Sequence, residues 1–342
     1  MKDKILLILT GGTICSFADR SGEKKPDTKK ADYLIKEIFK ASDSPYKDAE
    51  FDDKIPMSIL SESMSCDRWN ELIEALREYK IENYRGVIIL HGTDTLAYTS
   101  AMLSLVLAGI NVPVFMVSSQ LPLTEEKANG NDNFRVAVEL IMKGIKPNVY
   151  VPYRNMDGKM LIHLGSHITQ CPNFSNDFHS LDESEVDMEN PCFGGVEFGS
   201  DGKIYDKIGK FSNSVLKIEP YVGLDYSRIR LDGIKAVCHG TYHSETLSVG
   251  TGESDPYSVF SLKECFSGEI PLFLTPCRYD AMEETSCYET TAHVVKNGAY
   301  PVWGLTSEMV YIKSMVGVAV GLFGEKLSRF LLNENINGEF HF

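Results

Sequence analysis

Two threonines follow glycines at the ends of apolar runs, and their hydroxyls are the first candidates for chemistry. Thr13 ends the segment LILTGGT, and Thr93 ends the segment IILHGT. A threonine hydroxyl acts as a nucleophile when a partner takes its proton. Asp94 follows Thr93 directly and provides a carboxylate that can bind the ammonium group of a substrate. The pattern makes Thr13, Thr93 and Asp94 candidates for one catalytic set, and it fits equally well with Asp94 and Thr95 as caps of a following helix.

A parallel sheet would bring these turns together. Short apolar runs alternate with helical patterns along the first 150 residues, and this order builds a mostly parallel sheet covered by helices. Ligands bind beyond the carboxyl ends of such strands, so we expect the two turns to share one pocket. We expect strands at 5–9, 86–90, 112–117 and 149–151, and helices around 34–39, from Ser65 to Tyr79, at 96–108 and at 134–142.

A second, shorter alternation of strands and helices follows residue 213. It contains a third glycine–threonine turn at 236–241. The expected strands are 234–238 and 270–275, and the expected helices begin at Pro256, near Glu289 and after Thr306. The polar residues 16–30 predict a mobile loop. The predicted fold class is α/β, with a larger domain at 1–190, a linker or hairpin at 191–213 and a smaller α/β domain at 214–342.

The composition excludes several classes of partner. The chain has 342 residues, which corresponds to about two domains, and a net charge of −14 at neutral pH. That charge repels nucleic acid and anionic lipid. No stretch approaches the roughly 18 apolar residues of a membrane span, and residues 5–9 are too few for a signal-peptide core. The eight cysteines form no C-x-x-C pair, so we expect reduced thiols and a cytoplasmic location.

Other chemistries lack their characteristic sequence patterns. No G-x-G-x-x-G follows the first strand, and no G-x-x-x-x-G-K-[ST] occurs, which argues against a nucleotide site. The pairs His163/His167 and His239/His243 are four residues apart but follow strand-like runs, so their spacing does not indicate a metal site. The G-x-S-x-G pattern of serine hydrolases is absent. We therefore expect neither a metal nor a cofactor.

The glycine–threonine motifs also resemble a known family. The segments 10–14 (TGGTI) and 90–96 (LHGTDTL) resemble the two signature motifs of the bacterial-type asparaginase/glutaminase family, most closely its cytoplasmic type I branch. Residues 117–123 and 129–133 resemble the next family segments, and 274–277 and 288–290 resemble weaker ones. The resemblance implies a larger flavodoxin-like N-terminal domain and a smaller α/β domain. It also implies a homodimer or homotetramer that hydrolyses the side-chain amide of asparagine, and sometimes glutamine, without a cofactor.

The resemblance assigns roles to individual residues. It implies that Thr13 attacks the amide carbon, that Thr93 is the second essential threonine, and that Asp94 holds the α-amino group. Ser61 matches a serine that binds the α-carboxylate. Backbone N–H groups near Thr93 and Ser119 would stabilise the oxyanion. The complete set of implied substrate-binding residues is Ser61, Glu62, Gly12, Gly92 and Ser119.

Several positions depart from the family pattern. Gln170 stands where the family has a lysine that relays a proton, and a glutamine side chain does not titrate. A proton-transfer partner contributes about 10²–10⁴ in rate, so we expect another group to substitute. The candidates are His167, Lys159, and Glu283 from a C-terminal loop. The remaining departures are Phe17 in a loop that usually carries a tyrosine, where Lys24 or Lys25 would have to serve, and Ser63 and Asn129 in place of aspartates.

Three hypotheses follow from the sequence. The first is an L-asparaginase-type amidohydrolase that acts on a small amino-acid amide. The second is an amino-acid-binding or regulatory protein on the same scaffold with weak turnover, which the glutamine at position 170 favours. The third is an amidotransferase component that works on misacylated transfer RNA. We disfavour the third, because such proteins usually carry an extra N-terminal domain, the first expected strand begins at residue 5, and the net charge is −14.

Overall fold

Continuously apolar runs form the central strands of a seven-stranded sheet. A computed structural model describes residues 3–18, 21–188, 193, 203–252, 255–277 and 288–341. Every residue of β1 (Ile5–Leu9) and β5 (Gly86–Leu90) is buried, as expected for parallel strands covered on both faces. The strand order is β4-β1-β5-β6-β7-β8-β9. The other strands are β4 (Phe51–Lys54), β6 (Val114–Val117), β7 (Val149–Arg154), β8 (Met160–Leu164) and β9 (Val186–Asp187).

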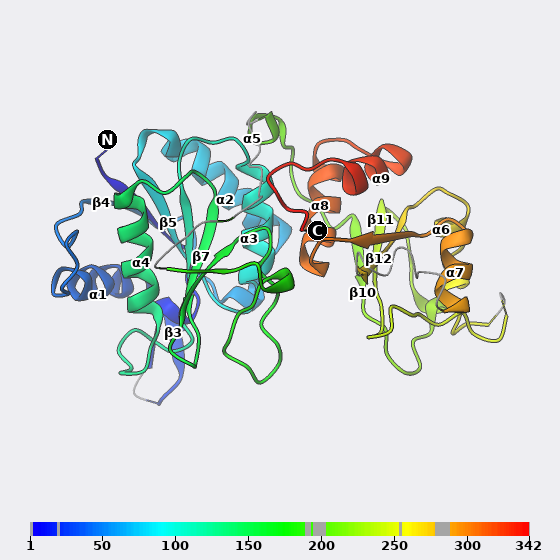
Figure 1. The fold of residues 1–342 in the computed structure, drawn as a ribbon, viewed down its shortest axis with the longest axis horizontal. Coiled ribbons are helices and arrows are strands. Elements are labelled where there is room, and N and C mark those ends of the chain that lie inside the picture. The colour runs from blue at the N-terminus through cyan, green and yellow to red at the C-terminus, as the bar shows by residue number, and fades with distance from the viewer. Residues whose placement is uncertain are drawn as a thin grey trace. The chain divides into compact units, whose positions relative to one another are not determined.

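The first five strands in this order are parallel, and β8 and β9 add an antiparallel edge. The predicted α/β class with a large parallel-sheet domain is therefore confirmed. The predicted helices of this region are also present, as α1 (Thr28–Lys40), α2 (Cys66–Tyr79), α3 (Leu96–Val106) and α4 (Gly130–Lys143). Helix α4 packs against β5, β6, β7 and α1 (Figure 1). Ser65 caps α2 by accepting a hydrogen bond from the Arg68 backbone N–H over 3.5 Å.

The prediction of a loop over residues 16–30 is wrong. Strands β2 (Ser16–Ala18) and β3 (Lys24–Pro26) form an antiparallel hairpin in which Phe17 lies opposite Lys25. Helix α1 then begins at Thr28, because the Asp27 side chain accepts a hydrogen bond from the Lys30 backbone N–H over 3.1 Å. Of the hairpin residues that the structure describes, 16–18 and 21–26, only Ser16 and Phe17 are buried. Its polar composition therefore hid the strands from a search for apolar runs.

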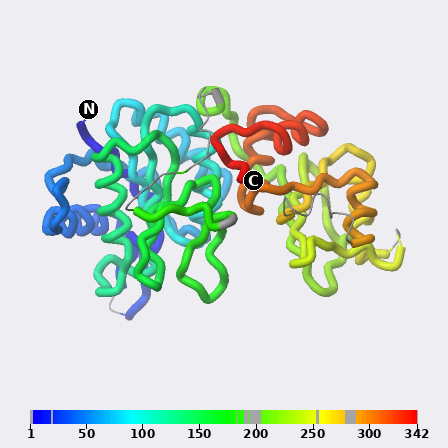
Figure 2. The backbone as a smooth tube through the Cα atoms, in the orientation of Figure 1, coloured from blue at the N-terminus to red at the C-terminus, as the bar shows by residue number. Residues whose placement is uncertain are grey.

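A four-stranded parallel sheet organises the second half of the chain. Its order is β10-β11-β12-β13, built from Val215–Ile218, Ala236–Gly240, Leu272–Cys277 and Tyr300–Trp303. The helices predicted near Glu289 and after Thr306 are confirmed as α7 (Glu289–Lys296) and α8 (Ser307–Ala319). Helix α9 (Gly324–Asn333) packs against α8, as the red end of the tube in Figure 2 shows.

Two further predictions in this region need correction. No helix begins at Pro256, because the Asp255 carboxylate accepts hydrogen bonds from the backbone N–H groups of Thr251 and Tyr257 and closes a turn. A 3-10 turn at Val259–Ser261 follows, and the next α-helix is α6 (Lys263–Phe266). In the expected linker or hairpin at 191–213, residues 191, 192 and 194–202 lie outside the described residues. Lys203–Lys207 forms helix α5, so the C-terminal part of that segment is helical and not a hairpin strand.

The chain divides into two compact units, Met1–Asp206 and Lys207–Phe342. The domain limits proposed from the sequence, at 190 and 214, stay predictions. In the part of the chain that the structure describes, no helix is both long enough and apolar enough to cross a membrane.

Candidate active site

Two glycines bring the threonine-bearing turns into contact. A Cβ atom placed on Gly12 would lie only 2.3 Å from both the N and Cα atoms of Gly92, and one placed on Gly92 would lie 3.0 Å from the Cα atom of Gly12. Strands β1 and β5 are parallel neighbours whose register pairs Leu9 with Leu90. Both turns therefore leave the same edge of the sheet, and Thr13 and Thr93 each follow a glycine at their contact.

The first turn requires glycine for a second reason. Gly11 and Gly12 have φ angles of +114° and +78°, which residues with a side chain rarely adopt. A Cβ atom on Gly11 would lie 2.1 Å from the carbonyl oxygen of Ile59. That oxygen accepts a hydrogen bond from the Gly12 N–H over 2.8 Å. The segment that leads to Ser61 is thus bound directly to the turn that presents Thr13.

Ser61 connects this segment to the second turn. It begins a short 3-10 turn, Ser61–Ser63, and its side chain is buried. Its Oγ donates to Oδ2 of Asp94 over 3.1 Å and accepts from the Asp94 N–H over 3.2 Å. The Thr95 hydroxyl donates to the carbonyl oxygen of Ser61 over 2.9 Å and makes no capping bond to α3. The Asp94 carboxylate is exposed and held in place, which leaves its second oxygen for a ligand.

The threonine hydroxyls are available to a ligand. Thr13 and Thr93 are both half-buried. Within the described ranges, neither side-chain hydroxyl has a hydrogen-bond partner. An exposed carboxylate can bind an ammonium group, and a hydroxyl near it can attack a carbonyl carbon. Glu62, the next residue after Ser61, is exposed at the same 3-10 turn.

Gln170 reaches the second turn from a distant part of the sequence. Its Nε2 atom donates to the carbonyl oxygen of Asp94 over 2.6 Å. Its Oε1 atom is buried and has no partner among the residues that the structure describes. Such an oxygen can accept a hydrogen bond from a hydroxyl, an amide or an ammonium group.

The other candidate proton relays lie elsewhere or are not described. The Nδ1 atom of His167 lies 3.0 Å from the Ser184 hydroxyl, and the imidazole is buried. Lys159 is exposed and pairs with Asp157 over 3.6 Å. Glu283 lies outside the described residues. Of these side chains, the structure thus connects Gln170 to the turn that carries Thr93.

Ser119 and Asn129 belong to a buried network that supports the strand ends. The Ser119 hydroxyl donates to the carbonyl oxygen of Leu121 over 2.6 Å and accepts from the Gly130 N–H over 3.1 Å. The Asn129 side chain accepts from the Gln120 N–H over 3.0 Å. The Ser119 hydroxyl is therefore engaged in the scaffold, whereas the role that the family resemblance implies here belongs to backbone N–H groups near Ser119.

The hairpin that follows Thr13 carries several positive charges. The Lys30 Nζ atom lies 4.1 Å from the centre of the buried Phe17 ring, a cation–π geometry. Lys25 pairs with Glu23 over 2.8 Å. A cavity of about 520 Å³ lies beside the hairpin, and its lining includes Phe17, Lys25, Lys30 and Ser58. The lining also includes Asp27, so side chains of both charges border this cavity.

A buried histidine, for which the sequence motifs predicted no role, supports the second turn. His91 directly precedes Gly92, and its Nδ1 atom lies 2.7 Å from the carbonyl oxygen of Gly92. Burial lowers the pKa of His91 to about 4. The ring is therefore neutral at pH 7, and its Nδ1–H donates to that carbonyl. The sequence feature that could have indicated this role is the position of His91 directly before the turn, in the LHGTDTL motif.

The described residues contain no group of three or more His, Cys, Asp or Glu side chains that could hold a metal ion. The nearest thiol in sequence, Cys15, is buried, and burial raises its pKa to about 12. That thiol is therefore protonated and unreactive at pH 7. The reactive groups that the described site offers are hydroxyls, a carboxylate, an amide and backbone N–H groups.

Comparisons with known proteins find a matching family model, sequence relatives and a similar fold. The family model described as "Asparaginase, N-terminal" matches residues 4–185. Over 98% of its length, the chain is 26% identical to a glutamyl-tRNA(Gln) amidotransferase subunit of Methanococcus maripaludis, of which it covers 80%. It is 25% identical to an L-asparaginase of Thermococcus kodakarensis, with 98% of both chains covered. The fold resembles that of the thermostable L-asparaginase from Thermococcus kodakarensis, with a TM-score of 0.72, 23% identity and 99% of both chains covered.

Proposed function

This chain belongs to the asparaginase family, and from that membership we propose that it is an amidohydrolase that releases ammonia from the side-chain amide of L-asparagine or a related amide. The observation that carries the proposal is the contact of Gly12 with Gly92, from which Thr13 and Thr93 both extend. Two hydroxyls at one sheet edge, beside an exposed carboxylate, are the groups that acyl transfer from an amino-acid amide requires.

The proposed reaction has two steps. The Thr13 hydroxyl oxygen attacks the amide carbon and forms a carbon–oxygen bond, which gives a tetrahedral intermediate. The carbon–nitrogen bond then breaks and leaves an ester on Thr13. The hydroxyl proton passes to the leaving nitrogen, which departs as ammonia. Water then hydrolyses the ester to give the carboxylic acid and restore Thr13. Backbone N–H groups near Thr93 and Ser119 would stabilise the oxyanion, and losing one such donor typically lowers the rate about 10²–10³-fold.

Substrate binding would depend on the joined pair Ser61 and Asp94. The exposed Asp94 carboxylate would bind the α-ammonium group, and the Ser61 hydroxyl would turn to the α-carboxylate. In the free protein that hydroxyl donates to Asp94 and accepts from its N–H, so Asp94 is already oriented before the substrate arrives. Pre-orientation of this kind reduces the entropy lost on binding.

The primary test is ammonia release from asparagine, glutamine and a panel of other amides. A Thr13→Ala variant should lose the activity, and Thr13→Ser should keep part of it because a hydroxyl remains. Thr241→Ala is the matched control, since Thr241 ends the third glycine–threonine turn and lies in the other unit. Undiminished ammonia release by the Thr13→Ala variant would show that another residue is the nucleophile.

A second candidate function is amino-acid binding with weak turnover. The observation that favours it is Gln170, whose amide contacts the Asp94 carbonyl and does not titrate. Titration calorimetry with aspartate and asparagine separates the two functions. Binding with no ammonia release supports this second candidate, whereas ready turnover rejects it.

The relatives carry two different names at nearly equal identity, so identity alone does not decide between their substrates. A glutamyl-tRNA(Gln) amidotransferase subunit and an L-asparaginase are both matched over 98% of this chain. The net charge of −14 opposes binding of nucleic acid. We therefore favour a free amino-acid amide as the substrate.

We also propose that the chain forms a homodimer or homotetramer and acts in the cytoplasm. Family membership supports the first proposal. Cys15, Cys66, Cys171, Cys238, Cys265 and Cys277 are free thiols, which supports a reducing compartment. Sedimentation velocity tests the assembly, since a monomer at micromolar concentration would contradict it. Cell fractionation tests the location.

A further inference from the structure

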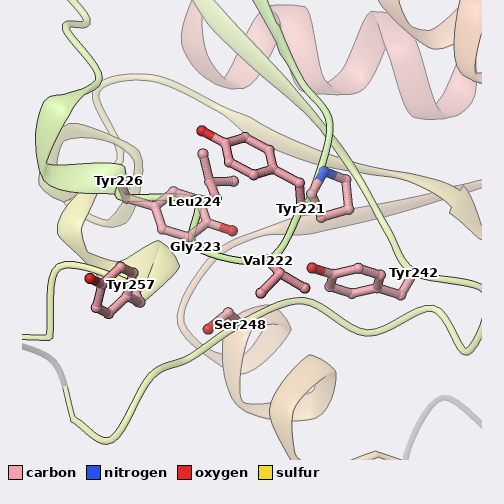
Figure 3. Close-up of a pocket in the computed structure, with 9 residues that line it drawn as sticks. Tyr221, Val222, Gly223, Leu224, Tyr226, Tyr242, Ser248 and Tyr257 are labelled. Atoms are coloured by element: carbon pink, nitrogen blue, oxygen red, sulfur yellow. The ribbon is translucent and has the colours of Figure 1, made fainter.

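A cavity in the second unit is lined by four tyrosines. It measures about 350 Å³, which is within the size range of small-molecule sites. Its lining comes from the loop after β10, the loop after β11 and the turn at 255–258. Figure 3 shows the side chains of these segments around it. The lining residues are Pro220, Tyr221, Val222, Gly223, Leu224, Tyr226, Tyr242, Ser248 and Tyr257.

The cavity lies where open parallel sheets bind ligands. Strands β10 and β11 are parallel neighbours, so the loops that follow them leave the same edge of the sheet. Crevices beyond the carboxyl ends of parallel strands are the usual ligand positions in open α/β sheets. The position and the size of the cavity therefore point independently to a small-molecule site.

Hydrogen bonds hold the three segments of the lining in place. The backbone N–H of Tyr226 donates to the carbonyl oxygen of Pro256 over 2.8 Å. Its hydroxyl lies 2.9 Å from Nε2 of the buried His239, and the Nδ1 atom of His239 lies 2.6 Å from the carbonyl oxygen of Gly240. Val259 donates from its N–H to the carbonyl oxygen of Ser248 over 3.0 Å. The cavity is thus formed before a ligand enters.

The chemistry of the lining favours a positive ligand. The nine lining residues include no lysine, arginine or histidine. The faces of tyrosine rings carry negative potential and attract ammonium groups. Carboxylates also adjoin the lining, because Asp255 lies two residues before Tyr257 and Asp225 precedes Tyr226. Asp225 is paired with Arg228 over 2.9 Å, whereas the Asp255 carboxylate is bound by Thr251 and the Tyr257 N–H.

Both carboxylates stay ionised at neutral pH. A hydrogen bond from the Ser227 hydroxyl lowers the pKa of Asp225, and a hydrogen bond from the Thr251 N–H lowers the pKa of Asp255. Because the Arg228 guanidinium offsets the charge of Asp225, the negative charge that persists beside the aromatic lining is that of Asp255. It would oppose the binding of an anion and favour a cation.

We propose that this cavity binds a small organic ammonium ion, with tyrosine rings contacting the cation and Val222 and Leu224 contacting its apolar part. The proposal concerns the second unit and is independent of the amidohydrolase activity. The ligand class is recognised by charge and by aromatic contact together, so a neutral molecule of the same shape should bind more weakly.

The test compares choline with 3,3-dimethyl-1-butanol, its neutral isostere, by titration calorimetry on the full chain. Choline should bind at one site, and the neutral alcohol should bind at least about 5-fold more weakly. Tyr242→Leu and Tyr257→Leu should each weaken choline binding about 5- to 30-fold. Tyr257→Phe should bind within about 2-fold of the wild type, since the ring is kept.

Two controls keep the result interpretable. Tyr288→Leu is a matched variant, because Tyr288 is 52% exposed, Tyr257 is 51% exposed, and Tyr288 does not line the cavity. It should bind choline normally. Asp94→Asn should also bind choline normally, which excludes the carboxylate of the candidate active site as the receptor. Circular dichroism of each variant checks that it is folded.

Three outcomes would overturn the proposal. The first is equal binding of choline and its neutral isostere, which would mean that the positive charge does not contribute to the affinity. The second is no choline binding by the folded wild type, or loss of binding in Asp94→Asn. The third is a fall in sedimentation mass in Tyr242→Leu and Tyr257→Leu with no change in choline binding, which would assign this surface to contact between copies of the chain.

Discussion

The side-chain amide of Gln170 donates a hydrogen bond to the backbone carbonyl of Asp94 over 2.6 Å, across 76 positions of sequence. The bond places an amide group beside the turn that carries Thr93. The other end of that amide, Oε1, is buried and has no partner within the described ranges. The group can therefore orient a hydroxyl or a water molecule, but it cannot store a proton.

The first prediction concerns Gln170→Lys. A lysine at this position would supply a titratable amine at the turn that carries Thr93, and a proton-transfer partner contributes about 10²–10⁴ in rate. We expect kcat for asparagine to rise by about 10²-fold. Steady-state ammonia release measures the change. Gln170→Met is the control, because methionine fills a similar volume and has no titratable group. A lysine variant no faster than the methionine variant would contradict this role.

The second prediction concerns Gly12→Ala. The new Cβ atom would lie 2.3 Å from the backbone of Gly92, so the two turns would have to separate. Gly144→Ala is the matched control, because its φ of +77° is close to the +78° of Gly12 and nothing lies within 4 Å of its Cβ position. Denaturant unfolding should show Gly12→Ala less stable than the control by about 1–3 kcal/mol. Equal stability of the two variants, with full activity, would argue against the tight contact.

The third prediction concerns the pair Ser61 and Asp94. Ser61→Ala removes the hydroxyl that holds the Asp94 carboxylate, and a hydrogen bond to a charged group contributes about 1.5–3 kcal/mol. We expect KM for asparagine to rise about 10-fold or more with a smaller change in kcat. A double-mutant cycle with Asp94→Asn measures the coupling. Because the Ser61 hydroxyl would also contact the α-carboxylate, its removal should keep part of its effect in the Asp94→Asn background. The effect of the double variant should nevertheless be smaller than the sum of the two single effects, and full additivity would refute the coupling between Ser61 and Asp94.

The fourth prediction is a loss of stability in mild acid. Burial lowers the pKa of His91 to about 4, whereas an unperturbed histidine has a pKa of 6.5. Between these values the unfolded chain binds a proton that the folded chain does not, so the free energy of unfolding falls as the pH falls. The full contribution of His91 across this window is about 3 kcal/mol.

Denaturant unfolding of the wild type and of His91→Gln, at pH 7 and near pH 4.5, checks this prediction. Other buried histidines contribute in both proteins, because burial also lowers the pKa values of His163 and His239. The difference between the two proteins therefore isolates His91. We expect the wild type to lose more stability than the variant, and parallel losses would show that His91 does not titrate in this range.

Much of the fold was predictable from local pattern. Continuous apolar runs predicted β1 and β5, and the capping residues Ser65 and Thr306 predicted the starts of α2 and α8. Local patterns failed where polar side chains made specific bonds. Asp255 closed a turn in place of a helix start, and the polar segment after Thr13 paired as the β2–β3 hairpin.

The sequence by itself determined the central strands, the glycine-rich turns and the family, because burial on both faces and backbone freedom at glycine leave a direct mark on residue type. The parallel sheet further implied that the two threonine turns share an edge. Only the tertiary structure decided how closely they meet, at Gly12 and Gly92, and which groups join them. Ser61 lies 33 positions from Asp94 and Gln170 lies 76 positions from it, and contacts at such separations depend on the packing of whole segments and not on local sequence.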